Sequence, residues 1–311
     1  MGMTISKNTL RNWLKKGKTY LDELVCVLKS IALEKDSIVN CDETWCKVRK
    51  YDHYKKCYMW VLVNKAERLV IFFYEDGSRG RDVLTNFLGD AELKALMSDG
   101  YNAYVFIGDE LKTHRYKDTD HQVCLAHVRA KFVKARMEGG DKRADVFLGN
   151  INRLFRFERE YDREMITDGE RTRRRQGLPT MEAIINLRAN LLQELKSEEE
   201  QKSCYMREAL NYLHKFWNEA FTYIKDGRYP ISNNLAERAV RPFTTKRKNS
   251  LHFGSDEGAE IAAVYHSIIS TVKLQGRSAW DYLGKFFTGI FNGCRDFLSL
   301  TPQNIDLAVC Q

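Results

Sequence analysis

Hydrophobic residues near the start of the chain cluster in a way that predicts β-strands. Residues 36–74 are rich in β-branched and aromatic side chains, and polar breaks interrupt them at YDHYK and NKAER. Apolar runs bounded by short polar turns are typical of strands. Because the connections are too short for a crossover, we expect three strands that pair antiparallel.

The next part of the chain mixes helical and strand patterns. Residues 80–89 predict a short helix, and residues 95–106 predict a strand that ends at the Asp99-Gly100 turn. Residues 121–127 form a short apolar run that leads into another helix. This succession predicts an α/β fold, in which helices flank a mixed sheet.

Helical periodicity and dense charge dominate residues 128–228. One apolar stripe is formed by Ile184, Leu187, Leu191, Leu192 and Leu195. A second helix with a broader apolar face follows from residue 203, and Gly227 and Pro230 stop it. We therefore expect an all-α insertion here.

Two more helices are predicted after this insertion. The first carries one apolar face, formed by Ile261, Val264, Ile268, Ile269 and Val272. Ser255 or Asp256 is expected to cap its start, and Gly276 to end it. A terminal helix is expected at about residues 279–290.

Composition and charge narrow the class of protein. The 311 residues are 43% hydrophobic and 30% charged, which is ordinary for a globular protein. The net charge of +8 suits a polyanionic partner. No run of about eighteen apolar residues predicts a membrane span, and the N-terminus lacks the apolar core of a secretory signal. We expect a cytoplasmic protein whose irregularly spaced cysteines are reduced and form no zinc site.

A single acid, Glu237, stands in a basic stretch with the sequence ISNNLAERAVRPFTTKRKN. One interpretation is a capping box, in which Asn234 caps a helix and Glu237 reaches back to a backbone N–H group. The other is a metal ligand on a surface that attracts phosphate. The flanking cations, which either neutralise DNA phosphates or form a solvated basic face, are Arg238, Arg241, Lys246, Arg247 and Lys248.

Two further acids are candidate partners for Glu237. Asp42 lies in NCDETW and Asp99 in MSDGY, each next to apolar residues of a predicted strand. Asp99-Gly100 could equally be a plain turn, and Asp42 could lie on a solvated strand face. Period two sends Asp42 and Glu43 to opposite faces. Two-metal phosphodiester chemistry needs such carboxylates from separate segments.

Four blocks together resemble one known family. They are NCDETW, MSDGY, VCLAHVRAKF and ISNNLAERAVRPFTTKRKNSLHFGSDEGA. They are similar to the transposases of the bacterial insertion sequence 66 family, which belong to the DDE superfamily. The resemblance implies a ribonuclease H-like core in which the insertion separates the fourth and fifth strands from the last catalytic helix. It also implies that Asp42, Asp99 and Glu237 are catalytic and hold two Mg²⁺ or Mn²⁺ ions.

The resemblance further implies partners and an activity. We expect metal-dependent cleavage of DNA at transposon ends, followed by transfer of the released strand to target DNA. Synapsis of two ends implies a homodimer on DNA, with possible accessory proteins of the same element, no membrane, and a cytoplasmic location on the nucleoid. Members of the family usually carry more DNA-binding sequence ahead of this region. The alternatives are therefore a truncated, non-catalytic DNA-binding remnant and a ribonuclease H-like nuclease without strand transfer.

Three other features of the sequence are candidates for contact with DNA. Cys124 and His127 form a C-x2-H pattern that either packs at the sheet edge or contacts DNA. The basic run at residues 170–179 could be a DNA clamp or a solvated loop. The segment ISKNTLRNWLKKG resembles the recognition-helix end of a helix-turn-helix.

The patterns divide the chain into five predicted parts. They are an N-terminal helical segment with the helix-turn-helix remnant (1–35), a first core part (36–127), the helical insertion (128–228), a final core part (229–290) and a C-terminal tail (291–311).

Overall fold

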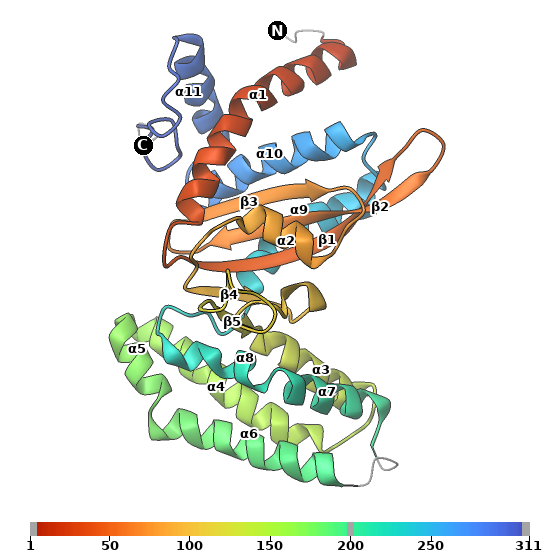
Figure 1. The fold of residues 1–311 in the computed structure, drawn as a ribbon, viewed down its shortest axis with the longest axis vertical. Coiled ribbons are helices and arrows are strands. Elements are labelled where there is room, and N and C mark those ends of the chain that lie inside the picture. Colours follow the sequence, from red (N-terminus) through yellow and green to blue (C-terminus); the bar gives the residue numbers. More distant parts are fainter. Residues whose placement is uncertain (1–4, 198–201, 307–311) are drawn as a thin grey trace. The chain divides into compact units, whose positions relative to one another are not determined.

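A computed structural model describes residues 5–197 and 202–306 (Figure 1). The chain forms two compact units. The first comprises Met1–Lys94 and Leu235–Gln311, and the second comprises Ala95–Asn234. These units divide the chain at other positions than the five predicted parts, which stay a prediction.

Three antiparallel strands form the sheet of the first unit, as the sequence predicted. Their order is β3-β2-β1, with β1 at Ile38–Arg49, β2 at Tyr54–Asn64 and β3 at Leu69–Glu75. In the β1–β2 register Asp42 lies opposite Val61. Since directly opposed residues share a face of the sheet, this register fixes which side each β1 residue occupies.

One face of this sheet is covered by α9 (Asn234–Ser250) and α10 (Asp256–Leu274), both drawn in blue tones in Figure 1. A buried hydrophobic cluster joins the helices to the strands and consists of Met59, Val61, Val63, Val70, Phe72, Ala236, Val240, Phe243 and Ala263. Of the two predicted caps of α10, the structure has Ser255, whose side chain accepts from the Gly258 N–H. The cluster fixes α9 over the face that carries Val61.

Two hydroxyl groups of α10 protect the edge strand β3. Ser267 Oγ accepts from the Phe72 N–H at 2.8 Å, and Thr271 Oγ1 accepts from the Val70 N–H at 3.0 Å. Both hydroxyl side chains are fully buried. Because an unpaired strand edge is a template for aggregation, these bonds both satisfy the backbone and close the edge.

The other face of the sheet packs on α2 (Arg81–Leu88). Phe87 of α2 stacks on Phe73 at 3.8 Å between ring centroids, and Phe73 stacks on Trp60 at 5.9 Å. This aromatic stack runs from α2 over β3 to Trp60 of β2. The first unit therefore has helices on both sides of its sheet.

Residues 7–32 form one unbroken helix, α1 (Lys7–Ala32). Ser6 caps its start, because its side chain accepts from the Thr9 N–H at 3.0 Å. The segment compared with a recognition helix is the first half of this long helix, rather than a separate short one. The C-terminal helix α11 (Ala279–Phe291) matches its predicted position.

The second unit contains a parallel strand pair and a helical array. The strands are β4 (Ala95–Ser98) and β5 (Asp120–Val123). The helices are α3 (Leu125–Met137), α4 (Ala144–Glu164), α5 (Asp168–Arg175), α6 (Leu178–Lys196), α7 (Cys204–Lys215) and α8 (Trp217–Phe221). With antiparallel strands in one unit and parallel strands in the other, the chain has the predicted mixed α/β character. Where one helix was expected from residue 203 onward, the chain breaks at Phe216 between α7 and α8.

The basic run at residues 170–179 is mostly helical, and its cations differ: Arg173 is exposed, whereas Arg175 is buried. Most of it forms α5, and Arg175 is only 1% exposed. Its guanidinium donates to Glu158 at 2.7 and 2.8 Å and to the carbonyl oxygens of Tyr223, Asp226 and Tyr229. Burial of an arginine requires such pairing, which a sequence pattern does not reveal.

Within the described residues, no helix is long and apolar enough to cross a membrane.

Candidate functional site

Asp42 lies in the middle of β1, on the face of the first unit that α9 covers. Its opposite residue, Val61, belongs to the cluster that includes Ala236 and Val240 of α9. The Asp42 side chain is half-buried, and its Oδ1 accepts from the Glu43 N–H at 2.9 Å. The backbone of β1 therefore holds the Asp42 carboxylate in place.

Glu43 points to the opposite face, as period two predicted. Its side chain is buried, and Arg79 Nε donates to its Oε1 at 2.6 Å. This ion pair anchors β1 to the loop before α2. Of the two neighbouring acids, Asp42 is therefore the one on the α9 side of the sheet.

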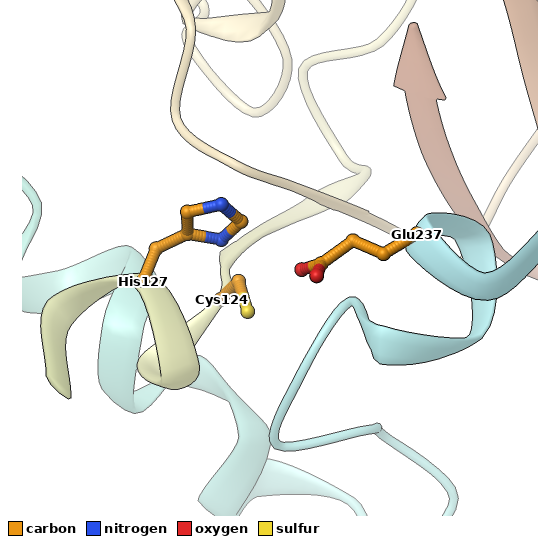
Figure 2. A group of neighbouring side chains, drawn as sticks. All are labelled: Cys124, His127 and Glu237. Carbon is orange, nitrogen blue, oxygen red and sulfur yellow. The ribbon is translucent and has the colours of Figure 1, made fainter. Parts of the chain in front are cut away.

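Glu237 lies in the first turn of α9 (Figure 2), and its side chain is half-buried. It directly follows Ala236, which packs against the sheet in the same cluster as Val61. Acids in the first helical turn interact favourably with the helix dipole. The fold of the first unit thus brings Asp42 and Glu237, almost two hundred residues apart in sequence, to the same face of one sheet.

Asp99 follows β4 at the predicted turn of the second unit. Its Oδ1 accepts from the Tyr101 N–H at 2.8 Å, and its carbonyl oxygen accepts from the Tyr212 hydroxyl at 2.5 Å. Burial, with the nearby Asp99 charge adding to it, raises the pKa of Tyr212, so this hydroxyl stays a donor. A tyrosine from α7 therefore fixes the backbone that carries Asp99.

Gly100 makes this turn possible, because its φ of +78° suits glycine. A Cβ atom there would lie 2.9 Å from Tyr212 Oη and 3.1 Å from a Phe216 ring carbon. We expect Gly100→Ala to lower the free energy of unfolding by about 1–3 kcal/mol, through strain and displacement of these rings. Denaturant unfolding measures the change.

Gly149→Ala is the matched control, because Gly149 lies within α4 and a Cβ there would meet nothing within 4 Å. It should raise stability by up to about 1 kcal/mol. Equal effects of the two substitutions would contradict the account of the Asp99 turn.

A buried pair, Ser98 and His121, supports the same turn. Ser98 Oγ lies 3.0 Å from His121 Nε2 and accepts from the Gly100 N–H at 3.2 Å. Burial lowers the pKa of His121 to about 4. The imidazole is therefore neutral near pH 7 and orders the serine hydroxyl without adding charge.

The depressed pKa of His121 predicts a loss of stability in mild acid. The unfolded chain binds a proton near pH 6.5, whereas the folded chain does so only near pH 4, so stability falls as pH falls between these values. From pH 7 to pH 5 the loss from this group is about 2 kcal/mol. Denaturant unfolding at both pH values should show it.

His121→Gln should remove that part of the pH dependence, while the same change at the exposed His214 should leave it intact. An unchanged slope in His121→Gln would mean that another group causes the loss.

Cys124 and His127 lie at the start of α3 (Figure 2). Cys124 is fully buried, its Sγ accepts from the Asn233 N–H at 3.1 Å, and its own N–H donates to Ser98 O at 3.0 Å. The sulfur and a ring nitrogen of His127 lie within 4.8 Å of each other. Cys124 therefore joins the end of β4 to the segment before α9.

The predicted DNA-contacting cations are not all alike. Arg238, Arg241 and Lys248 are exposed on α9. Arg247 instead donates to Thr44 Oγ1 at 3.0 Å and to the Trp45 carbonyl at 3.1 Å. The side chain of Lys246 lies outside the described part of the structure.

The structure also contains a cluster with two acids that the sequence patterns do not reveal. Cys57, Asp76 and Asp256 place one sulfur and two carboxylates within 4.8 Å of one another. Lys50 Nζ lies 2.6 Å from Asp256 and 2.9 Å from Asp76, and this contact lowers the pKa of Asp76 to about 2. The Lys50 ammonium group already pairs with both carboxylates, so the cluster ties the hairpin to α10 and is a poor metal site.

Carboxylates beside a helix with exposed cations offer oxygen ligands for a divalent metal ion and positive charge for a polyanion. The sequence model of the transposase IS66 family matches residues 1–261, and the chain belongs to this family.

Curated relatives come from Sinorhizobium fredii (strain NBRC 101917 / NGR234). The uncharacterized protein y4jD is 26% identical over 310 residues, which are 94% of this chain and 57% of the relative. The uncharacterized protein y4qI is 27% identical over 239 residues, which are 76% of this chain and 43% of the relative. The chain thus spans about half the length of these relatives.

Proposed function

We propose that this chain is the catalytic region of a DDE transposase with a ribonuclease H-like core. One observation carries the proposal: Asp42 and Glu237 come from distant segments, and both lie on the α9 side of the sheet in the first unit. The order β3-β2-β1 and the parallel pairing of β4 with β5 are also what such a core requires.

The residues fit divalent metal ions of the magnesium type. Mg²⁺ prefers oxygen ligands and takes one or two carboxylates from a protein. Asp42 and Glu237 are half-buried carboxylates, and Asp99 ends a strand in a turn that Tyr212 fixes. Two such ions, when bound, would activate the attacking oxygen and stabilise the leaving oxygen of a phosphodiester. We therefore propose as ligands the three acids that the family resemblance implies, Asp42, Asp99 and Glu237.

The other roles follow from charge and position. Arg238 and Arg241, exposed next to Glu237, would neutralise and position DNA phosphates without reading sequence. Cys124 and His127 would position the start of α3 rather than take part in the chemistry. Cleavage of one strand releases a 3′-hydroxyl, and that hydroxyl would displace a 3′-oxygen of target DNA in the joining step. Two copies, one for each transposon end, would form the active assembly.

Cleavage and joining assays on DNA that carries the element ends test this proposal. With Mg²⁺ or Mn²⁺ the protein should nick the ends and join them to target DNA. Cleavage without joining would favour a nuclease with the same core. DNA binding without any cleavage would favour a non-catalytic DNA-binding remnant.

A further inference from the structure

The outer half of the β1–β2 hairpin carries an unusual set of side chains on one face. The register places Trp45 opposite Tyr58, Lys47 opposite Lys56, and Arg49 opposite Tyr54. Directly opposed residues, and residues two apart on a strand, share a face. Aromatic and cationic groups therefore share this face, and they alternate along β2. We call these six residues, Trp45, Lys47, Arg49, Tyr54, Lys56 and Tyr58, the hairpin ladder.

The hairpin ladder is accessible to a partner. Trp45 is 36% and Tyr54 55% exposed, and the three cations are exposed as well. The hairpin extends beyond α2 (Figure 1), whose Phe87 stacks on Phe73 of β3. On the reverse face of the same strands, Cys46, Val48 and Cys57 are buried against Ala259. Core packing thus accounts for the residues on the reverse face of the hairpin but not for those of the hairpin ladder.

Cations and rings of the ladder are already in contact. Lys56 Nζ lies 5.9 Å from the Trp45 ring centroid and 5.7 Å from that of Tyr58. The Arg247 guanidinium lies 4.1 Å from the Trp45 centroid, and its hydrogen bonds to Thr44 and Trp45 fix it there. Such cation–π contacts hold the indole and the positive charge in a defined arrangement.

A pocket of about 230 Å³ opens at the edge of the ladder. Its polar lining includes Lys47, Arg247 and His252, and its apolar lining includes Phe243 and Phe253. The His252 ring also lies edge-on to Tyr54, with 4.7 Å between centroids. An apolar floor beneath a cationic rim suits a nucleobase attached to its phosphate.

We propose that the hairpin ladder binds an unpaired DNA strand, with one base in the pocket beside it. Aromatic side chains stack on bases only when the base faces are exposed, and in a duplex they are covered. Cations on one strand repeat at about 6.6 Å, twice the rise per residue, and can follow successive phosphates. The inference rests on the proposed function, because it supplies a place for the strand that is opened next to the cut.

Strand-binding measurements without divalent cations test the proposal. The whole chain is titrated with a fluorescent 20-nucleotide single strand and with the matching duplex, in EDTA, and Kd is read from anisotropy. Trp45→Ala and Tyr54→Ala should each raise Kd for the single strand by about fivefold or more. They should change Kd for the duplex less than twofold. The double substitution Lys47→Ala and Lys56→Ala should lower the salt slope by about 1.4.

Matched variants separate binding from folding. Trp280→Ala removes another exposed indole, 86% exposed on α11, and should leave Kd unchanged. Trp45→Phe should recover part of the affinity lost in Trp45→Ala. Hydrogen exchange on the unsubstituted chain should show protection of residues 45–58 by the single strand. Because this measurement needs no substitution, it tests whether the ladder binds the strand even if a variant fails to fold.

Three results would each overturn the proposal. The first is wild-type affinity of Trp45→Ala and Tyr54→Ala for the single strand, the second is equal losses for strand and duplex, and the third is protection by RNA but not by DNA. The binding assay needs no metal and is therefore independent of cleavage. If the ladder binds the single strand but the chain cannot cleave DNA, only the proposed function is refuted. Cleavage with unaltered binding in the ladder variants would refute only the ladder.

Discussion

Asp42→Asn and Glu237→Gln are each expected to reduce metal-dependent DNA cleavage to background, while duplex binding stays within about twofold of wild type. Each substitution keeps the size of the side chain and removes one negative charge from a ligand of the proposed metal site. Divalent cations bind carboxylates through that charge, whereas phosphate contacts depend on the arginines. Asp99→Asn should behave in the same way. Nicking of an end-labelled substrate measures cleavage, and anisotropy measures binding.

Glu23→Gln in α1 is the matched control, because it removes an exposed acid from the same unit outside the proposed site. It should cleave like wild type. Thermal unfolding of each variant excludes loss of fold as the cause. Full activity in Asp42→Asn or Glu237→Gln would remove that residue from the metal site, whatever the other variants show.

The second large effect is on stability. Arg175→Met is expected to lower the free energy of unfolding by about 3–5 kcal/mol, because it leaves the buried Glu158 carboxylate without its closest partner. It also leaves the carbonyl oxygens of Tyr223, Asp226 and Tyr229 without the guanidinium. Unsatisfied buried acceptors add to the cost. Denaturant unfolding followed by circular dichroism measures the change.

Arg163→Met is the control for loss of one positive charge, since Arg163 is exposed on α4. It should change stability by less than about 0.5 kcal/mol. The double variant Arg175→Met, Glu158→Leu should recover part of the loss, because it also removes the buried carboxylate, which in Arg175→Met keeps only Arg171 as a partner. A loss below about 1 kcal/mol in Arg175→Met alone would mean that the network is not important for stability.

Local patterns in the sequence were sufficient to predict most of the secondary structure. The β-rich segment, the cap at Ser255 and the turn after Ser98 all depend on neighbours within a few residues, and each lies where the pattern placed it. The break at Phe216 between α7 and α8 interrupts an apolar periodicity that continues across it. Such a break depends on tertiary packing, which outweighs local propensity.

Patterns of charged residues predicted less about the structure than patterns of apolar residues did, because they did not reveal which residues the charged side chains contact. The cations of α5 looked like a surface feature, yet Arg175 is a buried pairing partner of Glu158. Arg247 is one of the predicted phosphate contacts, and the sequence did not reveal that it also stacks on Trp45. In both cases the partner comes from a segment far away in sequence, so spacing alone could not identify it. The assignment of Asp42, Asp99 and Glu237 came from a family resemblance, and it stays a prediction.

The most direct test of the central claim is the location of metal ions in crystals of the whole chain soaked in Mn²⁺, by anomalous diffraction. The account predicts two ions about 3.5–4 Å apart, about 2.1 Å from carboxylate oxygens of Asp42, Asp99 and Glu237. Ions bound elsewhere, for example at Asp76 and Asp256, with none at Asp42 and Glu237, would contradict it.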